Sequence, residues 1–207
     1  FLRCGGRREE MRQRFGLGPG DFVFGKVARL FNLKGHEYVL QAARRVARDH
    51  PELRLLFVGD GILRGRLERM ANQLGLGEKV VFAGLVPSSE VPGCLAAMDA
   101  LVHASLREGL ARVLPQALLA GKPVVSFDVD GAREVVVEGE TGYLVAPKSV
   151  EGLAEVMAKV LERPEEAERM AARGRELCKE RFDWRRMVES LDSLYRRLLD
   201  RARTVGI

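Results

Sequence analysis

An acid and a glycine stand together at Glu108-Gly109, just before an apolar stretch that reads as a helix over residues 113–120. The first turn of a helix carries N–H groups without intrahelical partners and a partial positive charge, which suits an anion such as phosphate. Gly109 has no Cβ, so a ligand can approach its backbone closely. A carboxylate accepts hydrogen bonds from hydroxyl groups but is a poor partner for phosphate. The combination indicates a ligand such as a sugar beside a diphosphate, although an ordinary loop–helix junction explains the same residues.

Two cations, Arg29 and Lys34, follow the first predicted strand within one short loop. A guanidinium binds phosphate in a bidentate way, and an ammonium group acts as a compact point charge. Together they could hold a diphosphate, or they could be two solvated bases on a surface loop.

Other polar groups give weaker signals. Asp128-Val129-Asp130 has the D-x-D form of a metal site, but it lies in a glycine-containing turn, so we do not expect a metal there. His103 ends an apolar strand and reads as a core or rim residue rather than a catalytic one. The three cysteines are far apart and form no C-x-x-C, which argues against a metal or disulfide framework and for a reducing compartment.

The elements that must position these residues alternate between strand and helix. Hydrophobic periodicity predicts strands over 22–28, 53–58, 80–83, 100–102, 123–126 and 142–145, and helices over 7–17, 36–49, 63–74, 90–98, 113–120, 150–161, 164–179 and 183–202. The strands are short, nearly continuous apolar runs, as expected when helices cover both faces of a parallel sheet. The predicted fold is therefore a Rossmann-like, doubly wound α/β domain with a helical C-terminal segment. Its ligands should bind beyond the carboxyl ends of the strands.

Composition narrows the class of protein. The 207 residues can bury a substantial core, and 46% hydrophobic and 30% charged residues are typical of a globular protein. A net charge of +5 mildly favours anionic partners, but aromatic residues are only 6% and are not interleaved with basic ones, so we expect no nucleic acid binding. No apolar run approaches the ~20 residues that cross a bilayer. We expect a cytoplasmic protein, with peripheral contact to a membrane surface left open.

At this point the sequence resembles the C-terminal, donor-binding half of GT-B fold glycosyltransferases, the retaining family 4 (group 1) enzymes that include sucrose-phosphate and glycogen synthases. The likeness runs from about Phe22 to Arg197. It rests on the number and order of matching motifs: Val27-Ala-Arg29-Leu with Lys34-Gly35, Val58-Gly-Asp-Gly61, Val81-Phe-Ala-Gly84-Leu-Val-Pro87, Ser105-x-x-Glu108-Gly109, Gly121-x-Pro123-Val-Val, Glu138-Gly-Glu-Thr-Gly142-Tyr-Leu-Val and Arg181-Phe-Asp-Trp184.

The resemblance implies roles for the matching residues. Arg29 and Lys34 would hold the diphosphate of a nucleoside-diphosphate sugar, and Glu108 would accept hydroxyls of the transferred sugar. These three would carry the catalysis, with no metal and no other cofactor. The substrate-binding positions implied are the backbone amides of Gly109, Leu110, Ala111 and Arg112, the base-contacting segment Leu85, Val86 and Pro87, the ribose-contacting Gln116, and Gly61, whose Gly59-Asp60-Gly61 context also reads as a simple turn.

The chain departs from the family pattern at three places. Gln116 stands where the family usually has a second glutamate, Leu110-Ala111 replaces Phe-Gly, and Asp130-Gly131 replaces paired glycines. These changes keep open a non-catalytic nucleotide-sugar-binding module. The shared fold also leaves open half of a sugar-nucleotide 2-epimerase, and a plain flavodoxin-like module for another anion is a further alternative.

The resemblance also implies a division of the chain. Residues 1–20 would be a linker and short helix from a missing N-terminal domain, because the chain begins without methionine and reads as a piece of a longer protein. Residues 21–180 would form the nucleotide-sugar-binding domain. Residues 181–207 would form an amphipathic helix that packs on this domain and, as an open expectation, on the missing one. Without its N-terminal domain we expect the chain to transfer nothing.

Overall fold

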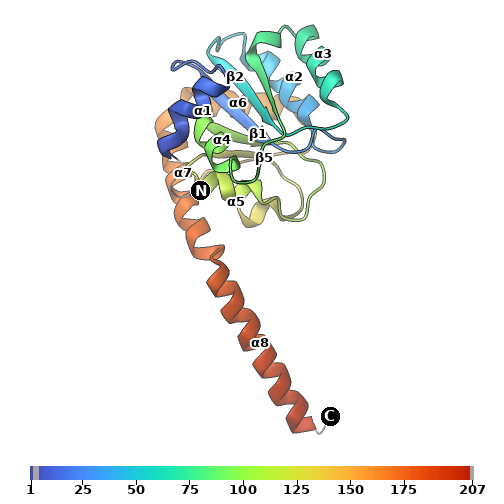
Figure 1. Ribbon diagram of the computed structural model, residues 1–207, viewed down its shortest axis with the longest axis vertical. Coiled ribbons are helices and arrows are strands. Elements are labelled where there is room, and N and C mark those ends of the chain that lie inside the picture. The colour runs from blue at the N-terminus through green and yellow to red at the C-terminus, as the bar shows by residue number, and fades with distance from the viewer. Residues whose placement is uncertain (2–4, 206–207) are drawn as a thin grey trace.

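A six-stranded, fully parallel sheet forms the centre of the molecule, in the order β3-β2-β1-β4-β5-β6. The structure, a computed structural model, describes residue 1 and residues 5–205, so Cys4 lies outside the described residues (Figure 1). The strands are β1 (Phe22–Val27), β2 (Leu53–Val58), β3 (Val80–Gly84), β4 (Ala100–His103), β5 (Val124–Phe127) and β6 (Gly142–Val145). Every strand predicted from the sequence is present, which confirms the doubly wound α/β fold.

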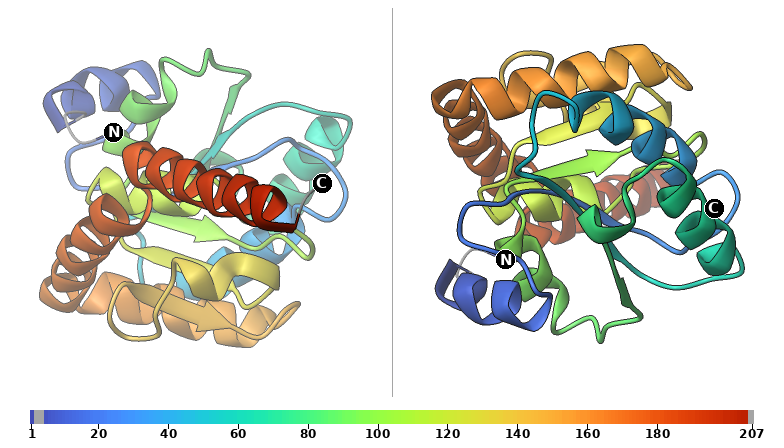
Figure 2. Two further views of the ribbon diagram at one scale, coloured as in Figure 1. Left: turned by 90° about the horizontal axis from the view of Figure 1, so that it is seen from below. Right: turned by 90° about the horizontal axis from the view of Figure 1, so that it is seen from above.

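Helices cover both faces of this sheet (Figure 2). They are α1 (Arg8–Arg14), α2 (His36–Val46), α3 (Arg64–Gln73), α4 (Val91–Ala97), α5 (Val113–Leu119), α6 (Val150–Glu162), α7 (Pro164–Arg181) and α8 (Trp184–Val205). Helices α2, α3 and α6 pack on one face, and α1, α4 and α5 pack on the other. Helix α7 contributes Met170 to the first layer and Leu177 to the second, so it closes the sheet beside β6.

The alternation of side chains along each strand builds the two layers. In β1, Phe24 enters the core beneath α2 and α6, while Val23 enters the core beneath α4 and α5. Gly25 follows on the second face, where a Cβ would lie only 1.9 Å from Sδ of Met98. A glycine is therefore needed at this position to seat the central strand against Met98.

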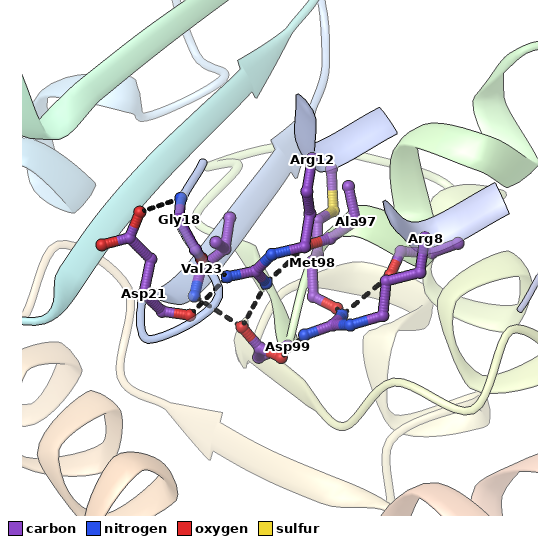
Figure 3. A network of polar contacts seen from close by, with 9 residues as sticks. Arg8, Arg12, Gly18, Asp21, Val23, Ala97, Met98 and Asp99 are labelled. Atoms are coloured by element: carbon purple, nitrogen blue, oxygen red, sulfur yellow. Dashed lines mark hydrogen bonds and ion pairs between the residues drawn. The ribbon is translucent and has the colours of Figure 1, made fainter. Parts of the chain in front are cut away.

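A partly buried charge network fastens α1 to the amino ends of the central strands (Figure 3). The carboxylate of Asp99 pairs with Arg8 at 2.6 Å and with Arg12 at 3.3 Å, and it accepts a hydrogen bond from the backbone N–H of Val23 at 2.8 Å. The nearly buried Arg12 also donates to the carbonyl of Asp21 at 2.7 Å. These contacts lie at the edge of the sheet opposite the strands' carboxyl ends, so they anchor the fold away from the predicted site.

Helix α8 leaves the body of the molecule and extends away from it (Figure 1). Its apolar side chains are exposed, with Trp184 at 63% and Leu199 at 59% of their surface in contact with solvent. The expectation that residues 181–207 pack on this domain is therefore wrong for the described part of α8. Its amphipathic pattern indicated a face that needs cover, but the core faces of the sheet are already covered by the preceding helices. No helix of the described chain is both long enough and apolar enough to cross a membrane.

Candidate functional site

The strand order reverses between β1 and β4, and in open α/β sheets such a reversal marks a crevice at the carboxyl edge of the sheet. On one side of this point the sheet continues from β1 to β2 and β3, and on the other side it continues from β4 to β5 and β6. Ligands of open α/β sheets bind at such a switch point, because the loops that leave the two strands diverge there. The loop after β1 carries Arg29 and Lys34, and the loop after β4 carries Glu108.

Lys34 and Glu108 meet across this crevice. The ammonium group of Lys34 donates to Oε1 of Glu108, and each side chain keeps about a fifth of its surface exposed (22% and 21%). The two loops are also bonded through their backbones, because the N–H of Leu106 donates to the carbonyl of Leu33 at 2.8 Å. Gly35 fits against the carbonyl oxygen of Ala104, where a Cβ would come within 1.8 Å. The loops that carry the two candidate residues therefore form one continuous surface.

A third loop supports Glu108 from the side of β5. The backbone N–H of Glu108 donates to Oδ2 of Asp130 at 2.6 Å, and the N–H of Gly131 donates to the carbonyl of Gly109 at 3.0 Å. On its other side, Oε1 of Glu108 lies 3.9 Å from Nε2 of His103. Asp130, which the sequence presents both in a D-x-D triplet and as a departure from paired glycines, thus lies directly against the site. The second of these features was the available signal, because an aspartate stands there where the family pattern has a glycine.

The backbone after Gly109 offers free donors. Within the part of the chain that the structure describes, the N–H groups of residues 109–112 have no hydrogen-bond partner. Leu110 and Arg112 are exposed, and Ala111 is half-buried. The peptide that follows Gly109 has a fixed orientation, because its carbonyl is held by Gly131. Its N–H, on Leu110, therefore points the opposite way.

Arg29 is exposed at the end of β1, and its guanidinium lies 5.7 Å from the centre of the Phe31 ring. Among the described residues it forms no ion pair, so its charge is available to a ligand. The structure places it on the same loop as Lys34 but shows no contact between Arg29 and Glu108.

The remaining predicted positions lie along the same edge of the sheet. Gly61 follows β2 and packs against the carbonyl of Leu30, where a Cβ would come within 2.4 Å, so its role in the structure is close backbone packing. Leu85 is 83% exposed in the segment Leu85-Val86-Pro87 after β3. Gln116 is half-buried in α5.

Beneath the crevice lies a set of buried polar side chains that sequence reasoning did not assemble. Lys26, His36, His103 and Ser105 are each at most 3% exposed, and Nζ of Lys26, both ring nitrogens of His36, Nε2 of His103 and Oγ of Ser105 have no hydrogen-bond partner among the described atoms. Burial, and then the nearby charge of Lys34, lower the pKa of Lys26 to about 7. Burial also lowers the pKa of His36 to about 2, with Lys26 as the second cause. For the same reasons the pKa of His103 lies well below its ordinary value. At neutral pH both histidines are uncharged.

The D-x-D triplet does not form a paired carboxylate site. Asp128 is bound to Arg133 of its own turn, and this hydrogen bond lowers the pKa of Asp128, whereas Asp130 faces Glu108. Across the described residues, no group of three or more histidine, cysteine, aspartate and glutamate side chains is arranged to hold a metal ion. Cys94 and Cys178 are buried free thiols, and burial raises the pKa of each to about 11.

The sequence of this chain matches a known family. The family model described as "Glycosyl transferases group 1" matches residues 7–177. Among curated proteins, the chain is 32% identical over 196 residues to the 2-deoxystreptamine glucosyltransferase of Streptomyces kanamyceticus, covering 94% of this chain and 51% of that protein. It is 34% identical over 185 residues to the GDP-mannose-dependent alpha-(1-6)-phosphatidylinositol monomannoside mannosyltransferase of Mycolicibacterium smegmatis, covering 86% of this chain and 48% of that protein. The chain thus spans about half the length of these relatives.

Solved structures show the same arrangement. The Anabaena protein Alr3699/HepE, crystallised in complex with UDP and glucose, superposes with a TM-score of 0.82 at 28% identity, over 91% of this chain and 52% of that chain. The sucrose-phosphate synthase of Thermosynechococcus elongatus superposes with a TM-score of 0.83 at 27% identity, over 93% of this chain and 49% of that chain.

Proposed function

Because this chain belongs to the group 1 glycosyltransferases, we propose that it is the donor-binding half of an enzyme that transfers a sugar, with retention, from a nucleoside-diphosphate sugar to an acceptor hydroxyl. The observation that carries the proposal is the meeting of Lys34 and Glu108 at the switch point between β1 and β4. At this point a cation that can bind phosphate stands beside a carboxylate that can bind hydroxyl groups. A nucleotide sugar contains both of these ligands, because its diphosphate is bonded directly to its sugar.

A cationic cradle would hold the diphosphate of the donor. This cradle consists of Lys34, Arg29 and the free N–H groups of residues 109–112, which would surround the diphosphate with positive charge. The leaving group is a nucleoside diphosphate, so negative charge grows on a phosphate oxygen as the sugar departs. Fixed donors at that oxygen stabilise the transition state by ~2–4 kcal/mol each. We propose that this cationic cradle supports transfer without a metal ion.

The sheet edge gives room for the rest of the nucleotide. Neighbouring strands lie ~4.8 Å apart, so the end of β3 lies ~10 Å from the end of β1 along the edge. A diphosphate at the crevice would put the base near the exposed segment Leu85-Val86-Pro87, with Gln116 as the proposed ribose contact. The relatives differ in this part of the donor, since one was crystallised with UDP and another is named for GDP-mannose.

The acceptor site would belong to a second domain. The chain spans about half the length of its relatives, and the exposed apolar face of α8 is suited to an N-terminal domain of the same enzyme. We therefore propose that residues 21–180 bind the donor, and that the chain by itself binds a nucleotide weakly and transfers nothing. We also propose a cytoplasmic location.

Calorimetric titration of the 207-residue chain with UDP, GDP and ADP tests the proposal. We expect Arg29→Ala and Lys34→Ala each to weaken binding of all these nucleotides by about tenfold, because each removes a charged donor from the diphosphate. Arg48→Ala is the matched control, since Arg48 is an exposed arginine near the end of α2, at the opposite edge of the sheet. Thermal melts of each variant check folding. If both site variants bind the nucleotides as tightly as the parent, the cradle is wrong.

A further inference from the structure

Asp130 has a backbone conformation that costs an aspartate energy. Its φ is 47°, in the left-handed region that glycine adopts freely and that aspartate tolerates better than most residues. A glycine at this turn would remove the strain. The strained conformation of this aspartate therefore points to a role of its side chain that glycine could not fill.

The side chain of Asp130 bonds a distant loop rather than its own turn. Its Oδ2 accepts the backbone N–H of Glu108 at 2.6 Å, across 22 positions in the sequence. By contrast, the carboxylate of Asp128, two residues earlier, is bound to Arg133 within the same turn. The two aspartates of the triplet therefore have different roles, and only Asp130 reaches the site.

A second bond runs beside the first. The N–H of Gly131 donates to the carbonyl of Gly109 at 3.0 Å, and a Cβ on Gly131 would approach that carbonyl oxygen to 2.9 Å. Asp130 and Gly131, in the loop after β5, are thus hydrogen-bonded to Glu108 and Gly109, in the loop after β4. The bond from Gly131 uses only backbone atoms, so it survives substitution of Asp130. The bond from Asp130 depends on its carboxylate and acts on Glu108 alone.

We propose that Asp130 is a positioning residue for the transferred sugar: its carboxylate fixes the backbone of Glu108 so that the Glu108 side chain stands beside Lys34 and meets the sugar hydroxyls. This proposal rests on the proposed function, in which Glu108 binds the sugar and Lys34 the diphosphate. Loss of the Asp130 carboxylate should therefore weaken binding of the sugar part of the donor and leave the diphosphate part nearly unchanged.

The test compares Asp130→Gly with Asp130→Asn. Glycine relieves the strained backbone but provides no acceptor, whereas asparagine tolerates the same conformation and keeps an acceptor oxygen. Asp128→Asn is the matched control, since it weakens the neighbouring pair with Arg133. Each variant is titrated with UDP and UDP-glucose, and with GDP and GDP-mannose, and the pair that the parent binds is used.

We expect Asp130→Gly to bind the nucleotide sugar about tenfold more weakly than the parent, with binding of the bare diphosphate changed by less than about twofold. Its melting temperature should stay close to that of the parent, because the relief of backbone strain is offset by the lost hydrogen bond and by the greater freedom of glycine in the unfolded chain. Asp130→Asn and Asp128→Asn should keep the parent's ratio between the two affinities. Parent-like binding of the nucleotide sugar by Asp130→Gly overturns the proposal, and so does an equal loss for both ligands with a lower melting temperature.

A ligand-free measurement separates this proposal from the proposed function. In Asp130→Gly, the amide proton of Glu108 should exchange with solvent about tenfold or more faster than in the parent, because its acceptor is gone. Unchanged exchange would show that the bond is absent and would overturn the proposal by itself. If instead the exchange rate responds but Lys34→Ala binds diphosphates as the parent does, the proposed function fails while the loop contact stands.

Discussion

Lys26 is a lysine in the interior of a parallel strand, 1% exposed and without a hydrogen-bond partner among the described atoms. Burial and Lys34 lower its pKa from 10.5 to about 7. Between these two values the unfolded chain holds a proton that the folded chain has released. The free energy of unfolding therefore rises with pH across this window, and the cost of the buried charge is fully present below pH 7.

Lys26→Met should remove this dependence. Methionine fills a similar volume without a charge, so we expect the variant to be more stable than the parent below pH 7. Between pH 7 and pH 10.5 the free energy of unfolding of the parent should rise, relative to that of the variant, by about 1.4 kcal/mol per pH unit. Urea denaturation at several pH values between 6 and 10 measures the difference, with Lys179→Met on the surface of α7 as a control. A constant difference between parent and Lys26→Met would contradict the lowered pKa.

At the scale of elements, Asp99 decides how α1 is held. Its carboxylate is shared by Arg8, Arg12 and the N–H of Val23, and Arg12 is only 6% exposed (Figure 3). Helix α1 is too short to be stable alone, so this network and its packing on α4 keep it in place.

Asp99→Ala should destabilise the fold by ~3–5 kcal/mol, because it leaves the buried guanidinium of Arg12 without its counter-ion. Chemical denaturation measures the loss, and Asp49→Ala, at an exposed position after α2, should change stability little. Backbone NMR shifts should change most in α1 and at the amino ends of β1 and β4. A loss below about 1 kcal/mol would mean that the network contributes no more than surface pairs do.

The elements themselves could be predicted from the sequence, but their contacts could not. Apolar runs and helical spacing placed every strand and every α-helix, since these patterns are local. The strand order is not encoded in such patterns, and the hydrogen bond from Glu108 to Asp130 depends on it. For the same reason, the D-x-D-G sequence read as a simple turn. Lys34 and Glu108 were expected to share one edge because the carboxyl ends of parallel strands meet there, and the structure brings them into contact.

At the scale of the whole molecule, α8 stands apart from the core. All its described side chains are exposed, including the apolar ones. Amphipathicity in the sequence showed that the helix has a face to cover, but it contained no information about what covers it. The contacts that the structure gives for α8 are its own helical bonds, charge pairs such as Arg196–Asp192, and a hydrogen bond from Arg186 to the carbonyl of Glu180 at the end of α7.

Removal of residues 184–207 should leave the melting temperature of the remaining chain within about 2 °C of the parent value, because α8 buries no described side chain in the core. The shortened chain should also self-associate less, since an apolar stripe is lost. Calorimetry and sedimentation measure the two effects, and hydrogen exchange of the parent should show little protection along α8. A drop of 5 °C or more would mean that α8 supports the body in solution.

The projection of α8 also has a mechanical consequence. A helix of 22 residues is about 33 Å long. A rotation of only about 5° where it joins α7, near Phe182, would sweep its far end through about 3 Å. Any partner that binds the far half of α8 would therefore move by several ångströms relative to the body of the molecule when the joint rotates by only a few degrees.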